Sequence, residues 1–258
     1  MTSAEYMLQL ERLRVRLKNA LNRLTVLTDK LDDNATLEEI VARAESLDSY
    51  DILNTLMGNE PYSIDDIDGK VTTNLKPAMF RADEYLTSVY LPKLASVGEN
   101  AFYNCNNLIT AKLGGERFDS YCFSGCSSLK NISLPSAHSL SVSHFFEGCK
   151  NLDCVTFCKQ GVARLSDSIG MLSGTPSVQA FVFPAKDSMA VLAGSSPRNS
   201  IRDTPTLYVY VPRALLDTYL ANSYWSTVNA SRPIRTIEDN IDFLKLIGAD
   251  LDDYEVVE

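Results

Sequence analysis

The chain has 258 residues and a formal net charge of −9, with 45% apolar and 22% charged residues. This composition allows a buried core and excludes an intrinsically disordered protein. No apolar run approaches the about 18 residues that a membrane-spanning helix requires, so we expect no membrane insertion. The acidity lies mainly at the two ends of the chain, and no basic stripe is present, which argues against a nucleic-acid partner.

The first predicted element is a helix over residues 1–33 with a narrow apolar stripe. Its apolar residues recur at alternating spacings of 4 and 3, which is the a/d pattern of a coiled coil. Such a stripe favours association between chains, although a helix folded back on its own chain would also bury it. The predicted oligomerisation residues are Tyr6, Leu10, Leu13, Leu17, Ala20, Leu24, Leu27 and Leu31.

Two further segments precede the middle of the chain. A second helix is predicted over residues 34–60, where Asn34 or Thr36 can serve as the N-cap. Residues 61–78 are rich in Asp and contain Gly69 and Pro77, a composition that predicts a linker, with a short first strand as the alternative.

Residues 79–211 contain a repeat with a period of 21 to 26 residues. Each unit has a Phe or Leu, followed by apolar residues at offsets of 6, 9 and 11. The end of each unit predicts a strand, and such units bury their apolar side only by stacking into a solenoid. The five copies are marked by Phe80, Phe102, Phe123, Phe146 and Leu172, and their strands are predicted around 89–91, 111–113, 132–134, 155–157 and 181–183.

The cysteines follow the same repeat. Cys105, Cys126 and Cys149 each stand three residues after the Phe, which predicts a ladder of small, buried, reduced side chains. The C-x3-C spacing of Cys122 and Cys126, and of Cys154 and Cys158, also occurs in zinc sites, but we favour the repeat over zinc as the explanation. We therefore expect no metal, no cofactor and no catalytic cysteine, and the sequence assigns no role to Cys154 or Cys158.

After the repeats, residues 206–212 alternate between apolar and polar side chains and predict a sixth strand. A short amphipathic helix over 213–220 follows, and then the only tryptophan, Trp225. We interpret Trp225 as a packing residue at the end of the solenoid, with a ligand platform as the alternative.

The repeat pattern resembles the BspA-type (treponemal) leucine-rich repeat. The resemblance is carried by residues 101–108 (AFYNCNNL), 122–129 (CFSGCSSL) and 145–152 (FFEGCKNL). It implies a leucine-rich-repeat β-solenoid of about five to six rungs, and together with the N-terminal α-helical coiled-coil segment that the heptad pattern predicts, this gives an α+β fold. A C-terminal cap at 212–237 and a short helix with an acidic tail at 238–258 complete this architecture.

Nothing in the sequence matches the motifs of an enzyme: no nucleophile with its base, no phosphate-binding loop and no metal-ligand spacing rich in histidine. The resemblance implies instead a non-enzymatic virion protein of a tailed bacteriophage, a tail or head fibre or appendage that contributes to host-surface attachment. The alternative is a bacterial BspA-like adhesin or protein-interaction scaffold. The N-terminus lacks a secretory signal, which favours the virion over the cell surface.

The implied partners are other virion proteins, bound through the N-terminal helices, and a glycan or protein of the host surface. By analogy with phage fibres, the coiled coil is expected to form a homotrimer. Binding residues are expected in the loops between rungs, because loops on a rigid scaffold carry most binding sites. The candidates are Tyr103, Phe118, Tyr121, His138 and His144.

Overall fold

The computed structural model describes residues 62–65, 74–140, 143–160, 164–166, 171–193, 204, 206–252 and 254. The chain divides into two compact units, residues 1–62 and 63–258, and the description below concerns the second. The predicted coiled coil and the predicted helix over 34–60 lie outside the described residues. Within the described ranges, no helix is long and apolar enough to cross a membrane.

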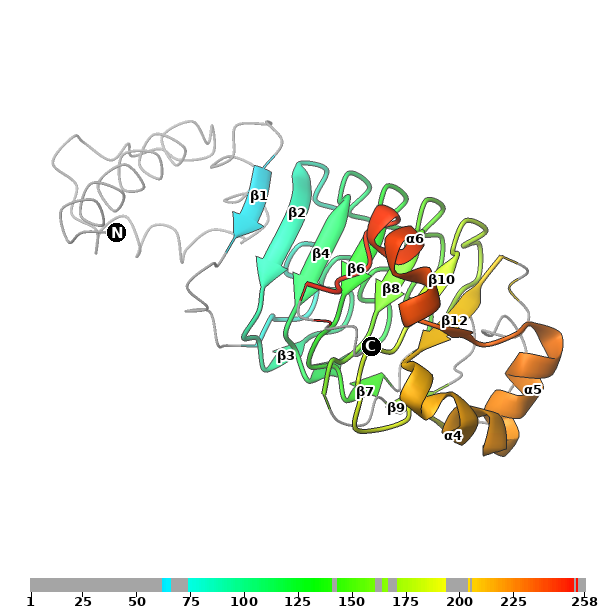
Figure 1. The fold of residues 1–258 in the computed structure, drawn as a ribbon. Helices are drawn as coiled ribbons and strands as arrows, with labels where there is room; N and C mark the ends of the chain where they lie inside the picture. The colour runs from blue at the N-terminus through cyan, green and yellow to red at the C-terminus, as the bar shows by residue number, and fades with distance from the viewer. Residues whose placement is uncertain are drawn as a thin grey trace, which may run out of the picture. The chain divides into compact units, whose positions relative to one another are not determined.

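Two sheets run the length of this unit (Figure 1). The larger sheet contains β1 (Tyr62–Asp65), β2 (Leu86–Leu91), β4 (Thr110–Leu113), β6 (Asn131–Ser133), β8 (Cys154–Thr156), β10 (Ala180–Val182), β12 (Tyr208–Val211) and β13 (Arg235–Thr236), in that order. The smaller sheet contains β3 (Ser96–Val97), β5 (Arg117–Phe118), β7 (Ser139–Leu140), β9 (Arg164–Ser166) and β11 (Val191–Ala193). From β2 to β13 the neighbouring strands of the larger sheet pair in parallel.

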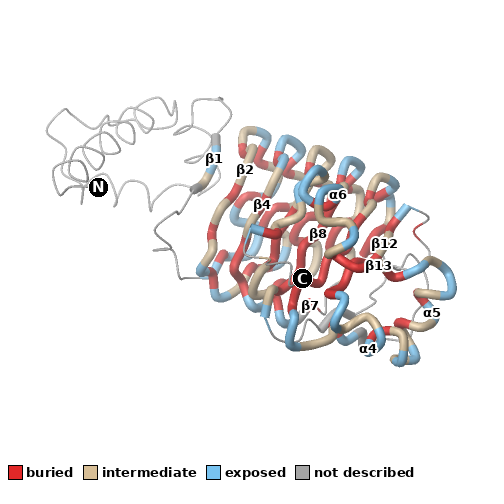
Figure 2. The backbone as a smooth tube through the Cα atoms, viewed as in Figure 1, coloured by how far each residue is buried: buried red, intermediate tan, exposed pale blue. Residues whose placement is uncertain are grey.

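The predicted solenoid strands, including the sixth at β12, are therefore confirmed, and each rung lies in register with the next. Parallel pairing in register places residues of one repeat column side by side, so every column becomes a row along the solenoid. One inward-facing row consists of Val89, Ala111, Ile132, Val155, Phe181 and Val209. Figure 2 shows how buried residues follow the strands.

Inside the solenoid, the phenylalanine column forms a stack of rings. Phe80 and Phe102 have ring centroids 5.3 Å apart, and Phe102 and Phe123 have centroids 5.1 Å apart, with nearly parallel planes. All three side chains are buried. The ring stack explains why this column accepts so little variation.

The cysteine column lies beside the ring stack, and its placement confirms the predicted ladder. Cys105, Cys126 and Cys149 are buried, and each thiol donates a hydrogen bond to the backbone carbonyl of the Phe in the preceding rung, at 2.8, 3.0 and 3.1 Å. Thr175 makes the same bond through its hydroxyl, at 2.7 Å. The column therefore selects a small hydrogen-bond donor, a requirement that the interpretation as small hydrophobes did not include.

Three helices follow β12: α4 (Leu216–Ala221), α5 (Ser223–Ser231) and α6 (Ile241–Leu246). Asn222 caps α5, because its side chain accepts hydrogen bonds from the first amides of the helix. Trp225 on α5 is fully buried; its indole N–H donates to the carbonyl of Ala190 at 2.8 Å, and its ring meets Phe183 edge-on. The interpretation of Trp225 as a packing residue is confirmed.

Candidate interaction surfaces

The first candidate surface consists of the turns that carry the Phe column, residues 78–82, 100–104, 121–125 and 144–148, and is here called the turn face. Within each turn the amides point along the solenoid; those of Asn100, Phe102 and Asn104 donate to carbonyls of the next rung at 3.2, 2.9 and 2.8 Å. This arrangement requires two residues with positive φ in every turn. They are Ala78, Asn100, Tyr121 and His144 before the Phe, and Ala82, Asn104, Gly125, Gly148 and Gly174 after it.

Two of these positions hold large rings. Tyr121 (φ +60°) and His144 (φ +54°) are half-buried, and their rings stack with centroids 4.9 Å apart and planes 3° apart. A left-handed conformation is uncommon for a residue as bulky as tyrosine, whereas asparagine and glycine adopt it readily. Tyr121 therefore occupies a position where the backbone would favour a smaller residue, whereas histidine adopts this conformation more readily than most side chains.

Other polar groups flank this pair on the same turns. His144 Nδ1 lies 2.9 Å from Glu147 Oε2 without the alignment of a hydrogen bond. Tyr103 is half-buried, and the guanidinium of Arg81 lies 5.3 Å from its ring centroid. Aromatic rings with a carboxylate and a guanidinium beside them provide stacking and hydrogen-bonding groups together.

Of the five predicted contact residues, the structure brings Tyr103, Tyr121 and His144 onto the turn face. Phe118 does not belong there: it lies on β5 with its side chain buried and meets the ring of Phe145 edge-on at 5.7 Å. The prediction that Phe118 is a surface residue is wrong, because it faces inward from the smaller sheet. His138 is exposed, but it precedes β7 and is separate from the turn face.

The second candidate surface is the outer face of the larger sheet. Because side chains alternate along a strand, the residues between the inward-facing ones point outward in two rows. The first row is Ser88, Thr110, Asn131, Cys154, Ala180 and Tyr208, and the second is Tyr90, Lys112, Ser133, Thr156, Val182 and Tyr210. Both rows change from mostly polar on β2, β4 and β6 to mostly apolar on β8, β10 and β12.

The apolar part of this face is covered by the end of the chain. Leu244 and Leu251, with Ile237, form one buried cluster with Cys154, Ala180, Val182 and Tyr210. In Figure 1, α6 lies over the front of the sheet at β8 and β10. The cluster accounts for the burial of Cys154, whose side chain points outward from its strand and into the cluster. Burial there raises the pKa of the Cys154 thiol to about 12.

A buried carboxylate anchors this covering segment. Asp250 accepts hydrogen bonds from Ser133 (2.5 Å) and Lys159 (2.9 Å), and Lys112 Nζ lies 2.9 Å away. The Asp250 amide donates to the Thr156 hydroxyl at 3.0 Å. Burial by itself would raise the pKa of the Asp250 carboxyl, but the hydrogen bonds and the two ammonium groups outweigh it and lower that pKa.

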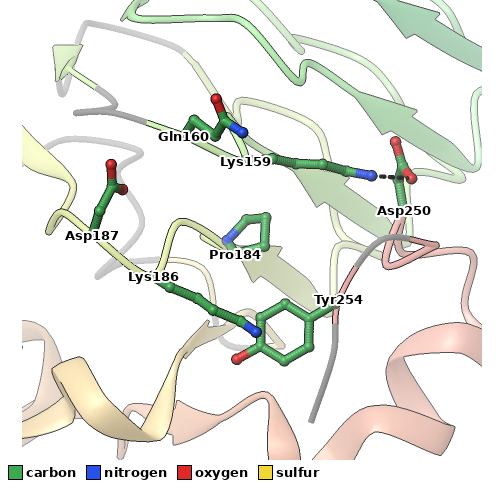
Figure 3. Close-up of a pocket in the computed structure, with 7 residues that line it drawn as sticks. All are labelled: Lys159, Gln160, Pro184, Lys186, Asp187, Asp250 and Tyr254. Atoms are coloured by element: carbon green, nitrogen blue, oxygen red, sulfur yellow. Dashed lines mark hydrogen bonds and ion pairs between the residues drawn. The ribbon is translucent and has the colours of Figure 1, made fainter. Parts of the chain in front are cut away.

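A cavity of about 430 Å³ opens beside this anchor (Figure 3). Lys159 turns toward Asp250, and Lys186 lies over the ring of Tyr254, with its Nζ 4.8 Å from the ring centroid. The remaining wall comes from the loops after β8 and β10: Gln160, Pro184 and Asp187. Within the described ranges, no three His, Cys, Asp or Glu side chains converge on a position that could hold a metal ion.

The sequence prediction missed the covered face, although a signal for it exists. Cys154, Ala180 and Val182 stand at outward positions of strands, where a solvent-exposed face would carry polar residues. The amphipathic residues that cover them lie more than 50 positions further along the chain, and their periodicity does not reveal which surface they bind.

Comparison with known families agrees with this architecture. Residues 64–169 match the family described as BspA type Leucine rich repeat region, in six copies. No curated protein and no solved structure matches the chain. Residues 64–169 are thus similar to a BspA-type leucine-rich-repeat region, and such a region suggests a protein-interaction or adhesin-type role.

Proposed function

We propose that this protein is a non-enzymatic binding module of adhesin type, and that the turn face binds a glycan or protein on a cell surface. The observation that supports this most directly is the stacked Tyr121–His144 pair on left-handed backbone. Residues 79–183 hold eight basic and eight acidic side chains, which fits recognition by stacking and hydrogen bonding better than capture of a charged polymer.

The energetics of the pair favour a functional interpretation. A left-handed conformation costs a non-glycine residue about 1 kcal/mol or more. An aromatic stack returns about 0.5–1.5 kcal/mol. Because the pair contains two left-handed residues and one stack, the strain is at least as large as the stabilisation, so the pair adds little to stability. Asn100 shows that asparagine serves the same turn position. Strained residues that stability does not require are typical of binding sites.

The test is the substitution Tyr121→Asn in the full chain. We expect a change in the free energy of unfolding below about 1 kcal/mol, because lost stacking and relieved strain offset each other. Binding to glycan arrays and to bacterial cells should fall strongly. Glu116→Gln, at an exposed residue outside the turn face, is the control and should bind as the wild type does. Binding that is equal in both variants would remove the turn face from the proposal.

More specifically, we propose that the protein is a virion appendage of a tailed bacteriophage and contributes to host attachment. It is supported by the heptad pattern of residues 6–31, which suits a trimeric coiled coil bound to other virion proteins. In the same architecture, residues 212–237 act as the solenoid cap, supported by the burial of Tyr219 and Trp225. Antibody labelling of particles and competition of adsorption by the purified full chain test it. Absence of label would favour the bacterial adhesin or scaffold.

A further inference from the structure

The covering segment, residues 238–254, is here called the C-terminal segment, and it is attached to the solenoid differently from every rung. Rungs are joined by ladders of backbone hydrogen bonds. Among the described residues, the backbone–backbone hydrogen bonds of the C-terminal segment all stay within residues 237–254. The Ile237 amide donates to the Val211 carbonyl at 2.9 Å, and beyond it the segment is held by side-chain contacts and by the bond from the Asp250 amide to the Thr156 hydroxyl. The strands beneath it keep their full pairing without it, so its release would leave no strand amide unpaired.

The charges of the two surfaces are complementary. Residues 238–258 carry eight acidic side chains and one basic one. Two of these acidic residues meet basic side chains around the apolar patch: Lys112 and Lys159 hold Asp250, and the Arg213 guanidinium pairs with Asp239. The Arg213 amide also donates to Glu238 at 2.9 Å. The sheet therefore presents an apolar centre with a basic rim, which is complementary to an acidic amphipathic segment.

From this arrangement we propose that the outer face of β8, β10 and β12 is a docking surface for an acidic amphipathic helix of a partner protein, and that the C-terminal segment is its exchangeable resident. Helix-in-groove recognition uses apolar anchors on one helix face; Leu244 of α6 has this role here, and Leu251 adds a second apolar anchor after the helix ends. The inference goes beyond the proposed function, because this surface is separate from the turn face and would bind a different partner.

Two features of the C-terminal segment allow its exchange for a partner helix: its helix is short, and it is held by the carboxylate of Asp250. Helix α6 has six residues, too few to be stable in isolation, so the segment depends on its contacts with the sheet. Asp250 is the acidic group most deeply engaged in those contacts, since it is held by Ser133 and two lysines. A partner helix that offers its own carboxylate to Lys112 and Lys159 can replace it without leaving either lysine unpaired.

The first test uses Cys154 as a built-in reporter, because it lies beneath the resident. Alkylation of Cys154 by N-ethylmaleimide, followed by mass spectrometry, should be about tenfold faster or more in Asp250→Asn, because a broken buried ion pair favours local opening. Cys126, inside the solenoid, should be as slow as in the wild type. Asp252→Asn removes the same charge from an exposed neighbour and should change neither rate.

The outcomes separate the proposal from simple instability. If Cys126 is alkylated in parallel with Cys154, the segment is an integral part of the fold and the proposal is wrong. An unchanged Cys154 rate would also overturn it. Lys112→Gln removes one of the two ammonium groups that hold Asp250, and Lys112 is partly exposed. It should also accelerate alkylation of Cys154, so it replaces Asp250→Asn if that variant folds poorly.

The second test identifies the partner chemistry. A fluorescent synthetic peptide of residues 237–254 should bind Asp250→Asn more tightly than the wild type, because its site is vacated more often. The same peptide with its carboxylates replaced by amides should bind at least tenfold more weakly. Equal binding of both peptides, or none, would contradict the proposal. If mass photometry shows that the Asp250→Asn variant forms dimers, the surface binds a second copy of this chain, and the proposal of a separate partner protein is wrong. These assays need no cell or particle, so they can fail independently of the proposed function.

Discussion

Along the larger sheet, the side chains that face inward stay apolar from β2 to β12, whereas those that face outward change from polar to apolar at β8. Both sets come from the same strands and the same register. The inward set is constrained by stacking, because each residue contacts its equivalents in the neighbouring rungs. The outward set has no such constraint and varies according to what it meets: solvent near β2, and the C-terminal segment beyond β8.

The same difference holds on the turn face. The Phe and Cys columns repeat there with little change, whereas the left-handed positions hold alanine, asparagine, glycine, tyrosine and histidine. In a solenoid, a residue that recurs at the same position of every rung is needed for stacking. A position where the residue type changes between rungs indicates a role other than stacking. The predictions below test this comparison.

The largest effect is expected in the ring stack. Phe123→Ala should lower the free energy of unfolding by about 3–5 kcal/mol, because it removes a fully buried ring from the solenoid centre. Urea denaturation measures this loss. Tyr103→Ala, on the turn face, removes a half-buried ring and should cost about 1 kcal/mol. Similar losses in the two variants would contradict the distinction between inner columns and outer positions.

Adjacent glycines give a sharper comparison. A Cβ on Gly114 would lie 1.7 Å from the carbonyl oxygen of Pro92, a backbone atom of the preceding rung. A Cβ on Gly115 would meet the Phe118 ring at 3.3 Å, where a side chain can adjust. Gly114→Ala should therefore cost about 1–3 kcal/mol or more, and Gly115→Ala clearly less. Differential scanning calorimetry compares them, and equal melting temperatures would show that the rungs separate at little cost.

The repeat made most of the solenoid predictable from the sequence. Fixed offsets from Phe80, Phe102 and Phe123 located the strands, because stacking transmits one register through all rungs. The same columns placed Cys105, Cys126 and Cys149 in the core. The hydrogen bond made by each thiol was not predicted, since a column shared by cysteine and threonine indicates a donor only when its acceptor is known.

The candidate surfaces were predictable only in part. Tyr121 and His144 were located in loops, but their stacking depends on backbone angles that no residue pattern specifies. Phe118 was misplaced because the strands of the smaller sheet are too short to show an alternating pattern. The covered sheet face depends on contacts such as Asp250 with Ser133, which are 117 positions apart. Contacts of that kind leave no periodic signal.

A smaller effect is expected in the cysteine column. Cys126→Val fills a similar volume but removes the donor to the Phe102 carbonyl, and should cost about 1 kcal/mol. Cys126→Thr keeps a donor, as Thr175 does two rungs away, and should be closer to the wild type. Chemical denaturation distinguishes the two variants. If valine is tolerated as well as threonine, the column selects for size alone.

The smallest effect on global stability is expected from acid at the C-terminal segment. The pKa of the Asp250 carboxyl is lowered in the folded state, so its ionised form stabilises the closed segment at neutral pH. That contribution is complete above the usual aspartate pKa of about 3.9 and is lost as the pH falls through the lower folded value. Hydrogen exchange of residues 238–252, corrected for the pH dependence of intrinsic exchange, should therefore report more frequent opening below about pH 4 than at neutral pH, while residues 101–134 stay protected.

In Asp250→Asn the segment should open equally often below about pH 4 and at neutral pH, because the titrating group is absent. A segment that opens on acidification to the same extent in both proteins would show that another carboxylate, such as Asp239 beside Arg213, controls its attachment to the sheet.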